Sequence, residues 1–195
     1  MSCKEEIILL GGGGHCKTVI DVIETQNRYK IVGIVDKKEK LGEKVLNYKI
    51  FATDEDLLFL AKEYKNILIT IGQIGTGEKR KIIFKKCKKL GFSFPVIISP
   101  YAYVSKYSSI GEGTVVIHGA VINPNAKVGR NCIINSKALV EHDAIVSNHC
   151  HISTGAIING GVEVGECSFV GSNASIKQYI KLPPYSFVKA GSLIK

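Results

Sequence analysis

The sequence lacks the common marks of a metal-binding, secreted or membrane protein. Its six cysteines form no CxxC pair and none of the spacings typical of zinc ligands. No uninterrupted apolar stretch approaches the length of a membrane span, and the first residues lack the apolar segment of a signal peptide. The phosphate-binding pattern GxxxxGK(S/T) is also absent. We therefore expect a cytoplasmic protein with reduced thiols and no bound metal.

The net charge of +9 is unevenly distributed along the chain. Residues 104–176 hold four basic and five acidic residues, so this part is near neutral and the excess lies elsewhere. The densest basic stretch, residues 79–89, has the pattern of an amphipathic helix with three apolar residues among lysines. A solvated helix face explains it, and attraction of phosphorylated ligands such as a nucleotide or CoA is the alternative. The charge therefore does not predict binding to nucleic acid.

The second half of the chain is an uninterrupted repeat of period six. From residue 104 to residue 176 every sixth residue is aliphatic, and a small residue, most often alanine, stands two positions before nearly every one. The aliphatic residues are Val104, Ile110, Val116, Ile122, Val128, Ile134, Val140, Val146, Ile152, Ile158, Val164, Val170 and Ile176. A period of six fits neither an α-helix nor a long strand, but it fits short strands separated by corners.

Such a repeat predicts a three-sided prism in which about eighteen residues make one coil. Residues i and i+18 then lie about 4.8 Å apart as neighbours in parallel strands, and the aliphatic side chains fill the interior. Cys132 and Cys150 are eighteen apart at the small inward position, so we expect them to be stacked core residues. After Ile176 the pattern is expected to stop, with a bend over residues 180–184 and a capping strand within residues 185–194.

The first half of the chain predicts a nucleotide or phosphate cradle. Residues 6–10 form an apolar strand that leads into a glycine run and then into a helix that reaches about Asn27. A second strand, residues 30–35, ends where dinucleotide-binding folds place a ribose-binding acid. Cys16 replaces the third glycine of GxGxxG, so NAD binding is weakly supported, and the glycines are otherwise explained as a tight turn. The candidate ligand-binding residues are Gly11, Gly12, Gly13, Gly14, His15 and Asp36.

Alternating strands and helices predict a small parallel sheet of Rossmann-like type for residues 1–100. The expected elements are strands at residues 49–52, 66–71 and 94–98 and helices at residues 54–65 and 78–90. The repeat domain then takes residues 101–195, so the predicted fold is a Rossmann-like parallel sheet followed by a parallel β-helix.

One of the four histidines in the repeat has a neighbour suited to catalysis. His142 is followed by Asp143, and a carboxylate beside an imidazole fixes its tautomer and stabilises the imidazolium. Gly160 lies eighteen residues after His142, hence one coil further at the same corner, where a glycine permits close approach of an oxyanion. His118 and His149 have no such partner, and we expect plain corner or surface residues there.

Together these motifs resemble the hexapeptide-repeat acetyltransferases that act on nucleotide-linked amino sugars. The family includes the UDP-4-amino-sugar N-acetyltransferase of bacillosamine synthesis and the sialic acid O-acetyltransferase-like group. The resemblance rests on the glycine run with His15, on Asp36 and on a set of residues in the repeat. The repeat residues are Asn135, His142, Asp143, His151, Gly155 and Ala156.

The resemblance implies a left-handed β-helix, a homotrimer and acetyl-CoA bound in the groove between neighbouring prisms. It implies that His142 is the general base oriented by Asp143, that Asn135 lies near the acetyl group and that His151 contacts CoA. It implies that the N–H group of Gly160 approaches the thioester carbonyl. The nucleotide sugar is then expected over the glycine turn, with His15 near its diphosphate or amine and Asp36 near its base or ribose.

We therefore expect an enzyme that transfers an acetyl group from acetyl-CoA to the amino group of a nucleotide-linked amino sugar, for a bacterial surface glycan. Two alternatives remain open from the residues. The first is O-acetylation of a sugar hydroxyl, because the same base serves both reactions. The second is a non-catalytic nucleotide-binding scaffold in which His142 is a plain corner residue.

Overall fold

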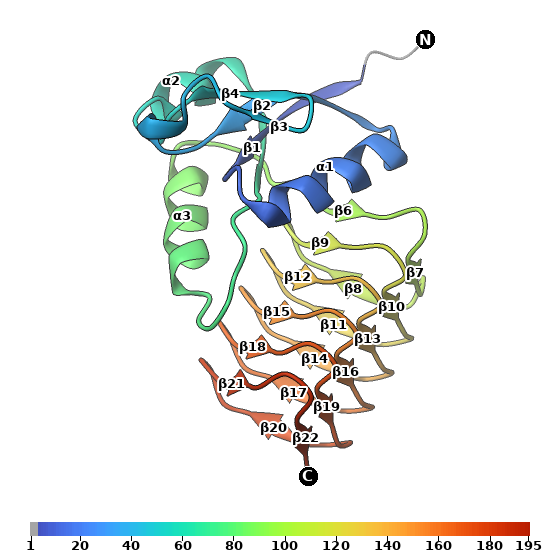
Figure 1. Ribbon diagram of the computed structural model, residues 1–195. Helices are drawn as coiled ribbons and strands as arrows, with labels where there is room; N and C mark the ends of the chain where they lie inside the picture. Colours follow the sequence, from blue (N-terminus) through green and yellow to red (C-terminus); the bar gives the residue numbers. More distant parts are fainter. Residues whose placement is uncertain (1–3) are drawn as a thin grey trace. The chain divides into compact units, whose positions relative to one another are not determined.

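The computed structural model describes residues 4–195, which form two compact units (Figure 1). The first unit contains the residues up to Gly72 together with Ile82–Pro95. The second contains Gln73–Lys81 and Val96–Lys195. The second unit therefore contains the repeat and a short segment that precedes it in the chain. We call this segment, Gln73–Lys81, the strap.

The first unit is built on a five-stranded sheet of order β3-β4-β2-β1-β5. All neighbours pair in parallel except β3 and β4, which form an antiparallel pair. The strands are β1 (Glu5–Leu10), β2 (Tyr29–Val35), β3 (Lys44–Val45), β4 (Tyr48–Ala52) and β5 (Asn66–Ile69). β1 and β5 are fully apolar and buried at their carboxyl ends, as expected of central strands in a parallel sheet.

The helices are α1 (Gly14–Gln26), the short 3₁₀ turn η1 (Lys38–Lys40), α2 (Leu57–Glu63) and α3 (Glu78–Lys89). α2 begins three residues later than the sequence predicts. The carboxylate of Asp56 accepts hydrogen bonds from the N–H and hydroxyl groups of Thr53, at 2.7 and 2.9 Å, and closes a turn there. This turn takes the place of the first predicted helical turn, and the helix starts at Leu57. No helix within residues 4–195 combines the length and apolar character needed to cross a membrane.

The second unit is a prism of three parallel sheets made of two-residue strands (Figure 1). Residues eighteen apart pair in every ladder, for example Val121 with Leu139 and Leu139 with Ile157. The strands are β6 (Ile97–Ile98), β7 (Tyr103–Val104), β8 (Ser109–Ile110), β9 (Val115–Val116), β10 (Val121–Ile122), β11 (Lys127–Val128), β12 (Ile133–Ile134), β13 (Leu139–Val140), β14 (Ile145–Val146), β15 (His151–Ile152), β16 (Ile157–Ile158), β17 (Glu163–Val164), β18 (Phe169–Val170), β19 (Ser175–Ile176), β20 (Lys181–Leu182), β21 (Phe187–Val188) and β22 (Leu193–Ile194).

The aliphatic residue of each hexad is the second residue of a strand and points into the prism. These residues and the small residues two positions before them form one continuous core, which includes Cys132 and Cys150. Both cysteines are fully buried, so their predicted core role is confirmed. The six-residue period therefore sets both the sheet register and the core, because each side chain stacks on its counterpart one coil away.

The prism extends beyond the predicted repeat at both ends. The segment expected as the last strand of the first sheet instead contributes β6, whose Ile97 pairs with Val115 of β9. At the other end the expected bend and single capping strand are wrong, because β20, β21 and β22 continue the eighteen-residue register. Pro183 and Pro184 lie at a corner between β20 and β21, outside the strands, so they do not interrupt a ladder.

Candidate active site

His142 and Asp143 lie at the corner between β13 and β14, which we call the histidine corner. The imidazole Nδ1–H donates to Asp143 Oδ2 at 2.8 Å, and both side chains are more than half exposed, at 59% and 58%. This hydrogen bond, and a second one from Asn125, lower the pKa of the Asp143 carboxyl below its ordinary value. An ionised carboxylate therefore fixes Nδ1 as the protonated nitrogen and leaves Nε2 free to accept a proton.

Gly160 lies on the same corner one coil further along the prism, as the eighteen-residue spacing predicts. A Cβ atom on Gly160 would lie 2.7 Å from Cε1 and 2.8 Å from Nε2 of His142. No side chain fits there without moving the imidazole, so only glycine allows the ring this position. The Cε1–Nε2 edge of the His142 ring thus lies where a side chain of residue 160 would begin.

The N–H group of Gly160 is not one of the donors of the prism ladder. At this corner Asn159 N–H donates to Ile176, Gly161 N–H to His142 and Val162 N–H to Asn159. Within residues 4–195, Gly160 enters the backbone hydrogen bonds of the turns only through its carbonyl, which accepts from Tyr179. A backbone N–H group in the residue next to a general base is the kind of donor that stabilises a developing oxyanion.

The coil on the other side of His142 supplies two asparagines that the sequence analysis missed. Asn125 Nδ2 donates to Asp143 Oδ1 at 3.3 Å, and Asn123 Nδ2 donates to Glu141 Oε2 at 2.7 Å. Each asparagine precedes its acid by eighteen residues, which is the signal that would have identified it. Asn125 also adopts a left-handed backbone, with φ of 60°, as corner asparagines commonly do.

Asn135 and His151 lie at a different corner, between β12 and β13 and on the adjacent strand β15. Asn135 Nδ2 donates to His151 Nε2 at 3.1 Å, and His151 Nδ1–H donates to the strap carbonyl of Gln73 at 2.7 Å. His151 is only 7% exposed, and burial lowers its pKa to about 4. The ring is therefore neutral, and both of its nitrogens are hydrogen-bonded to residues of the same chain. One chain does not bring this pair to His142, because the face that contains β13 separates the two corners.

His149 lies at a third corner and is buried rather than at the surface. It is 3% exposed beneath the strap, and Asn131 Nδ2 donates to its Nδ1 at 2.9 Å. Burial lowers its pKa to about 4. The strap reaches this corner through Arg80, which donates to the backbone and side-chain oxygens of Asn131. His149 is thus a structural histidine. His118 is half-buried and bonds through Nδ1 to Ser99 Oγ at 2.6 Å.

The glycine run of the first unit forms a tight turn between β1 and α1. Gly11 has φ of 110°, and a Cβ atom there would lie 2.4 Å from the side chain of Ile71. Gly12 N–H donates to Asp36 Oδ2 at 2.7 Å. Burial would raise the pKa of the Asp36 carboxyl, but hydrogen bonds from Lys37 N–H, Gly12 N–H and Lys40 outweigh it and lower the pKa. The ionised Asp36 therefore anchors the turn.

Gly13 and Gly14 open the first turn of α1. Gly13 is the N-cap, has no side-chain cap, and a Cβ atom at either position would meet no atom within 4 Å. Open space over the free N–H groups of a helix N-terminus suits a phosphate. The structure therefore brings Gly11–Gly14, His15 and Asp36 together in the first unit and holds His142, Asp143 and Gly160 together in the second.

Residues 6–87 match the family described as the PglD N-terminal domain. UDP-N-acetylbacillosamine N-acetyltransferase of Bacillus subtilis (strain 168) is 32% identical over 113 residues, which are 58% of this chain and 51% of that protein. The matched stretch thus spans about half the length of this curated relative.

Two solved relatives cover both units. The acetyltransferase domain of PglB from Neisseria gonorrhoeae FA1090 is 28% identical, with a TM-score of 0.90 over 98% of this chain and 92% of that chain. A histidine-to-asparagine variant of perosamine N-acetyltransferase from Caulobacter crescentus, in complex with CoA and GDP-perosamine, is 29% identical. Its TM-score is 0.91, over 99% of this chain and 90% of that chain. Over nearly its whole length the chain is therefore similar to acetyltransferases, among them one solved with CoA and a nucleotide-linked amino sugar.

This similarity confirms the resemblance found in the sequence. It also confirms the predicted fold class, a Rossmann-like parallel sheet followed by a left-handed parallel β-helix. Among the residues that the structure describes, no group of three or more His, Cys, Asp or Glu side chains is arranged to hold a metal ion.

Proposed function

We propose that the protein transfers the acetyl group of acetyl-CoA to the amino group of a nucleotide-linked amino sugar. The observation that carries the proposal is the His142–Asp143 pair, whose imidazole edge lies against Gly160. Relatives that match nearly the whole chain are acetyltransferases, and solved complexes of them contain CoA, acetyl-CoA or GDP-perosamine. These matches support acetyl transfer over a non-catalytic scaffold.

In the proposed mechanism His142 acts as the general base. Its Nδ1–H is held by the Asp143 carboxylate, so Nε2 removes a proton from the amine as the amine attacks the thioester carbonyl. The new C–N bond forms and the carbonyl π electrons move onto oxygen. The Asp143 carboxylate then stabilises the imidazolium.

Gly160 N–H is the proposed donor to the tetrahedral oxyanion, since Gly160 lies against the His142 ring and its N–H takes no part in the backbone ladder. When the intermediate collapses the C–S bond breaks, and the imidazolium returns its proton to the CoA thiolate. The products are the amide and free CoA, so protons and electrons balance with no further reactant.

The glycine turn of the first unit is the proposed nucleotide site. Gly13 and Gly14 present open backbone at the start of α1, which suits the diphosphate. His15 stays the predicted neighbour of the diphosphate or amine. Asp36 stays the predicted neighbour of the base or ribose, although it already accepts hydrogen bonds from Gly12 and Lys40.

A trimer remains part of the proposal because one chain separates Asn135 and His151 from His142. A neighbouring copy is then needed to supply the predicted CoA contacts, which is why the cleft is proposed between copies. The outer face that contains β10, β13 and β16 presents Val121, Leu139 and Ile157, all half-buried. Such an apolar stripe suits an interface between copies. A cytoplasmic location also remains a prediction.

The proposal is tested by incubating the protein with acetyl-CoA and UDP- or GDP-linked 4-amino sugars and weighing the products by mass spectrometry. We expect one acetyl group to be added to at least one amino sugar, and the product to survive hydroxylamine, which cleaves esters and leaves amides. Loss of the acetyl group in hydroxylamine would identify O-acetylation. Thermal shifts with nucleotide sugars but no turnover on any of them would favour the scaffold.

A further inference from the structure

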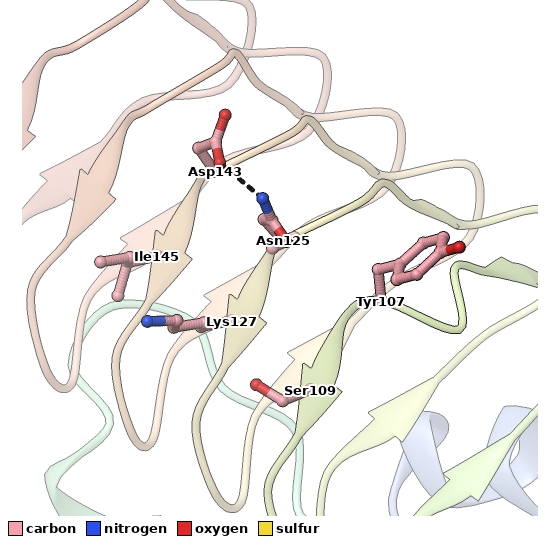
Figure 2. A pocket seen from close by; sticks show the side chains of 7 residues that line it. Tyr107, Ser109, Asn125, Lys127, Asp143 and Ile145 are labelled. Carbon is pink, nitrogen blue, oxygen red and sulfur yellow. Dashed lines mark hydrogen bonds between the residues drawn. The ribbon is translucent and has the colours of Figure 1, made fainter.

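A pocket of about 450 Å³ lies beside the histidine corner and spans three successive coils, the last of which carries His142. Figure 2 shows six of the side chains that line it. They are Tyr107, Ser109, Asn125, Lys127, Asp143 and Ile145. All belong to the second unit, and Lys127 pairs with Ile145 across neighbouring strands. The volume falls within the range of small-molecule sites, and the pocket shares Asp143 with the proposed catalytic pair.

The pocket extends from the His142 coil toward earlier coils, whereas Gly160 lies on the next coil after His142. Asn125 is one coil before the histidine corner, and Gly160 is one coil after it. A thioester whose oxygen meets Gly160 N–H extends on the Gly160 side, which is flanked by the ring of Tyr179 against Gly161. The preceding coil, about 4.8 Å away, then remains for the nucleophile's molecule.

The chemistry of the lining suits a sugar ring better than the arm of CoA. Lys127, the amide of Asn125 and the hydroxyl groups of Ser109 and Tyr107 can exchange hydrogen bonds with several sugar hydroxyls. The ring of Tyr107, whose side chain is largely exposed, offers a flat apolar face for the C–H face of a pyranose. The arm of CoA is a flexible chain without a ring, so it offers no flat C–H face to stack on Tyr107.

We propose that this pocket holds the sugar ring of the acceptor, so that acceptor and acetyl donor approach the histidine corner from opposite coils. The inference rests on the proposed function and adds the side from which each substrate enters. Tyr107 and Lys127 are the specificity-determining residues, because they bind the ring without touching the reacting atoms. Asn125 has a double role, since it holds Asp143 and faces the sugar.

The test compares two pairs of matched variants on the full chain. Tyr107→Ala and Lys127→Ala remove pocket side chains, and Tyr179→Ala and Lys181→Ala remove similar exposed side chains on later coils. Steady-state KM values are measured separately for acetyl-CoA and for the acceptor, with GDP-perosamine and a UDP-linked 4-amino sugar as the probes. Titration of the same nucleotide sugars by calorimetry gives their dissociation constants.

We expect each pocket variant to raise the KM and dissociation constant of the acceptor about tenfold, the effect of losing one or two hydrogen bonds, with the KM of acetyl-CoA unchanged. The Tyr179 and Lys181 variants should leave acceptor binding unchanged. A rise in the KM of acetyl-CoA for the pocket variants would place the donor there and overturn the inference. Unchanged acceptor binding in both pocket variants would overturn it as well.

The wild-type reaction separates this inference from the proposed function. If the wild-type protein acetylates neither probe nor any other nucleotide-linked amino sugar, the proposed function fails and the pocket assignment fails with it. If it does acetylate them while the pocket variants behave like wild type, only the pocket assignment fails. The altered side chains are exposed, so a folding defect is not expected, and circular dichroism checks this for each variant.

Discussion

Two corners of the same coil each carry a histidine, and only one of them is available for chemistry. His142 follows β13, is exposed, and pairs with Asp143 beside Gly160. His149 follows β14 and is buried beneath the strap, where it pairs with Asn131 and has a pKa of about 4. The repeat treats the two corners alike, so the difference comes from what covers them. The role of a histidine in a β-helix therefore follows from its burial and its hydrogen-bond partners, and not from its place in the repeat.

The most direct test of this difference between the two corners is to remove each imidazole. We expect His142→Ala to lower kcat by on the order of 1000-fold, the size of a general-base contribution, with unchanged stability because the side chain is exposed. His149→Ala should do the reverse. It should lower the free energy of unfolding by about 1 to 3 kcal/mol, because Asn131 loses a buried partner, and leave kcat per folded molecule near wild type.

Urea denaturation and steady-state kinetics on both variants provide the measurement. Comparable losses of kcat in the two variants would contradict the distinction between a catalytic and a structural corner.

The second prediction concerns Gly160. In Gly160→Ala the new Cβ atom would lie 2.7 Å from the imidazole of His142, so the exposed ring must turn away. Because misplacing a catalytic group by about 1 Å can cost on the order of 100-fold, we expect a loss of that size in kcat with a stable fold.

The control is the double variant. In a His142→Ala background, Gly160→Ala should add little, because the imidazole that it displaces is already absent. A full additional loss there would mean that the added methyl group impairs the reaction without displacing His142, for example by blocking the approach of the thioester.

The smallest expected effect is on the pH dependence of stability. His151 is buried with a pKa of about 4, below its ordinary value of 6.5. The unfolded chain therefore binds a proton between pH 6.5 and 4 that the folded chain excludes, and folding loses stability as the pH falls through this window. We expect His151→Gln to reduce the drop in unfolding free energy between pH 7 and 4.5 by about 2 kcal/mol relative to wild type.

Urea denaturation at the two pH values measures this difference. A drop as large in His151→Gln as in wild type would show that other groups cause the acid sensitivity.

Much of the prism could be predicted from the sequence. The six-residue period specifies the core and the pairing of residues eighteen apart, so the position of Gly160 beside His142 followed from counting. The last coil also carried the signal, since Leu182, Val188 and Ile194 continue the period, but the two prolines hid it. Prolines interrupt strands, but at a corner there is no strand to interrupt. The prolines are recognised as corner residues only when the six-residue count is continued past Ile176.

The packing of the strap over two corners of the prism could not be predicted in the same way. Gly77 of the strap fits against the prism because a Cβ atom there would lie 2.2 Å from the carbonyl oxygen of His149, and its N–H donates to Cys167. These contacts join residues some 70 to 90 positions apart, and no local period relates them. Side-chain pairs such as Asn135 with His151 were likewise predicted as two separate contacts to a ligand, and the structure shows them bonded to each other.

The sequence by itself determined the winding, the core and the stacking of like positions, because a strict period converts distance along the chain into position on the prism. Only the tertiary structure decided which corner stays open, because the strap packs on the prism through contacts that no periodicity encodes. That packing buries His149 and pins His151, and it leaves the imidazole of His142 exposed beside a pocket.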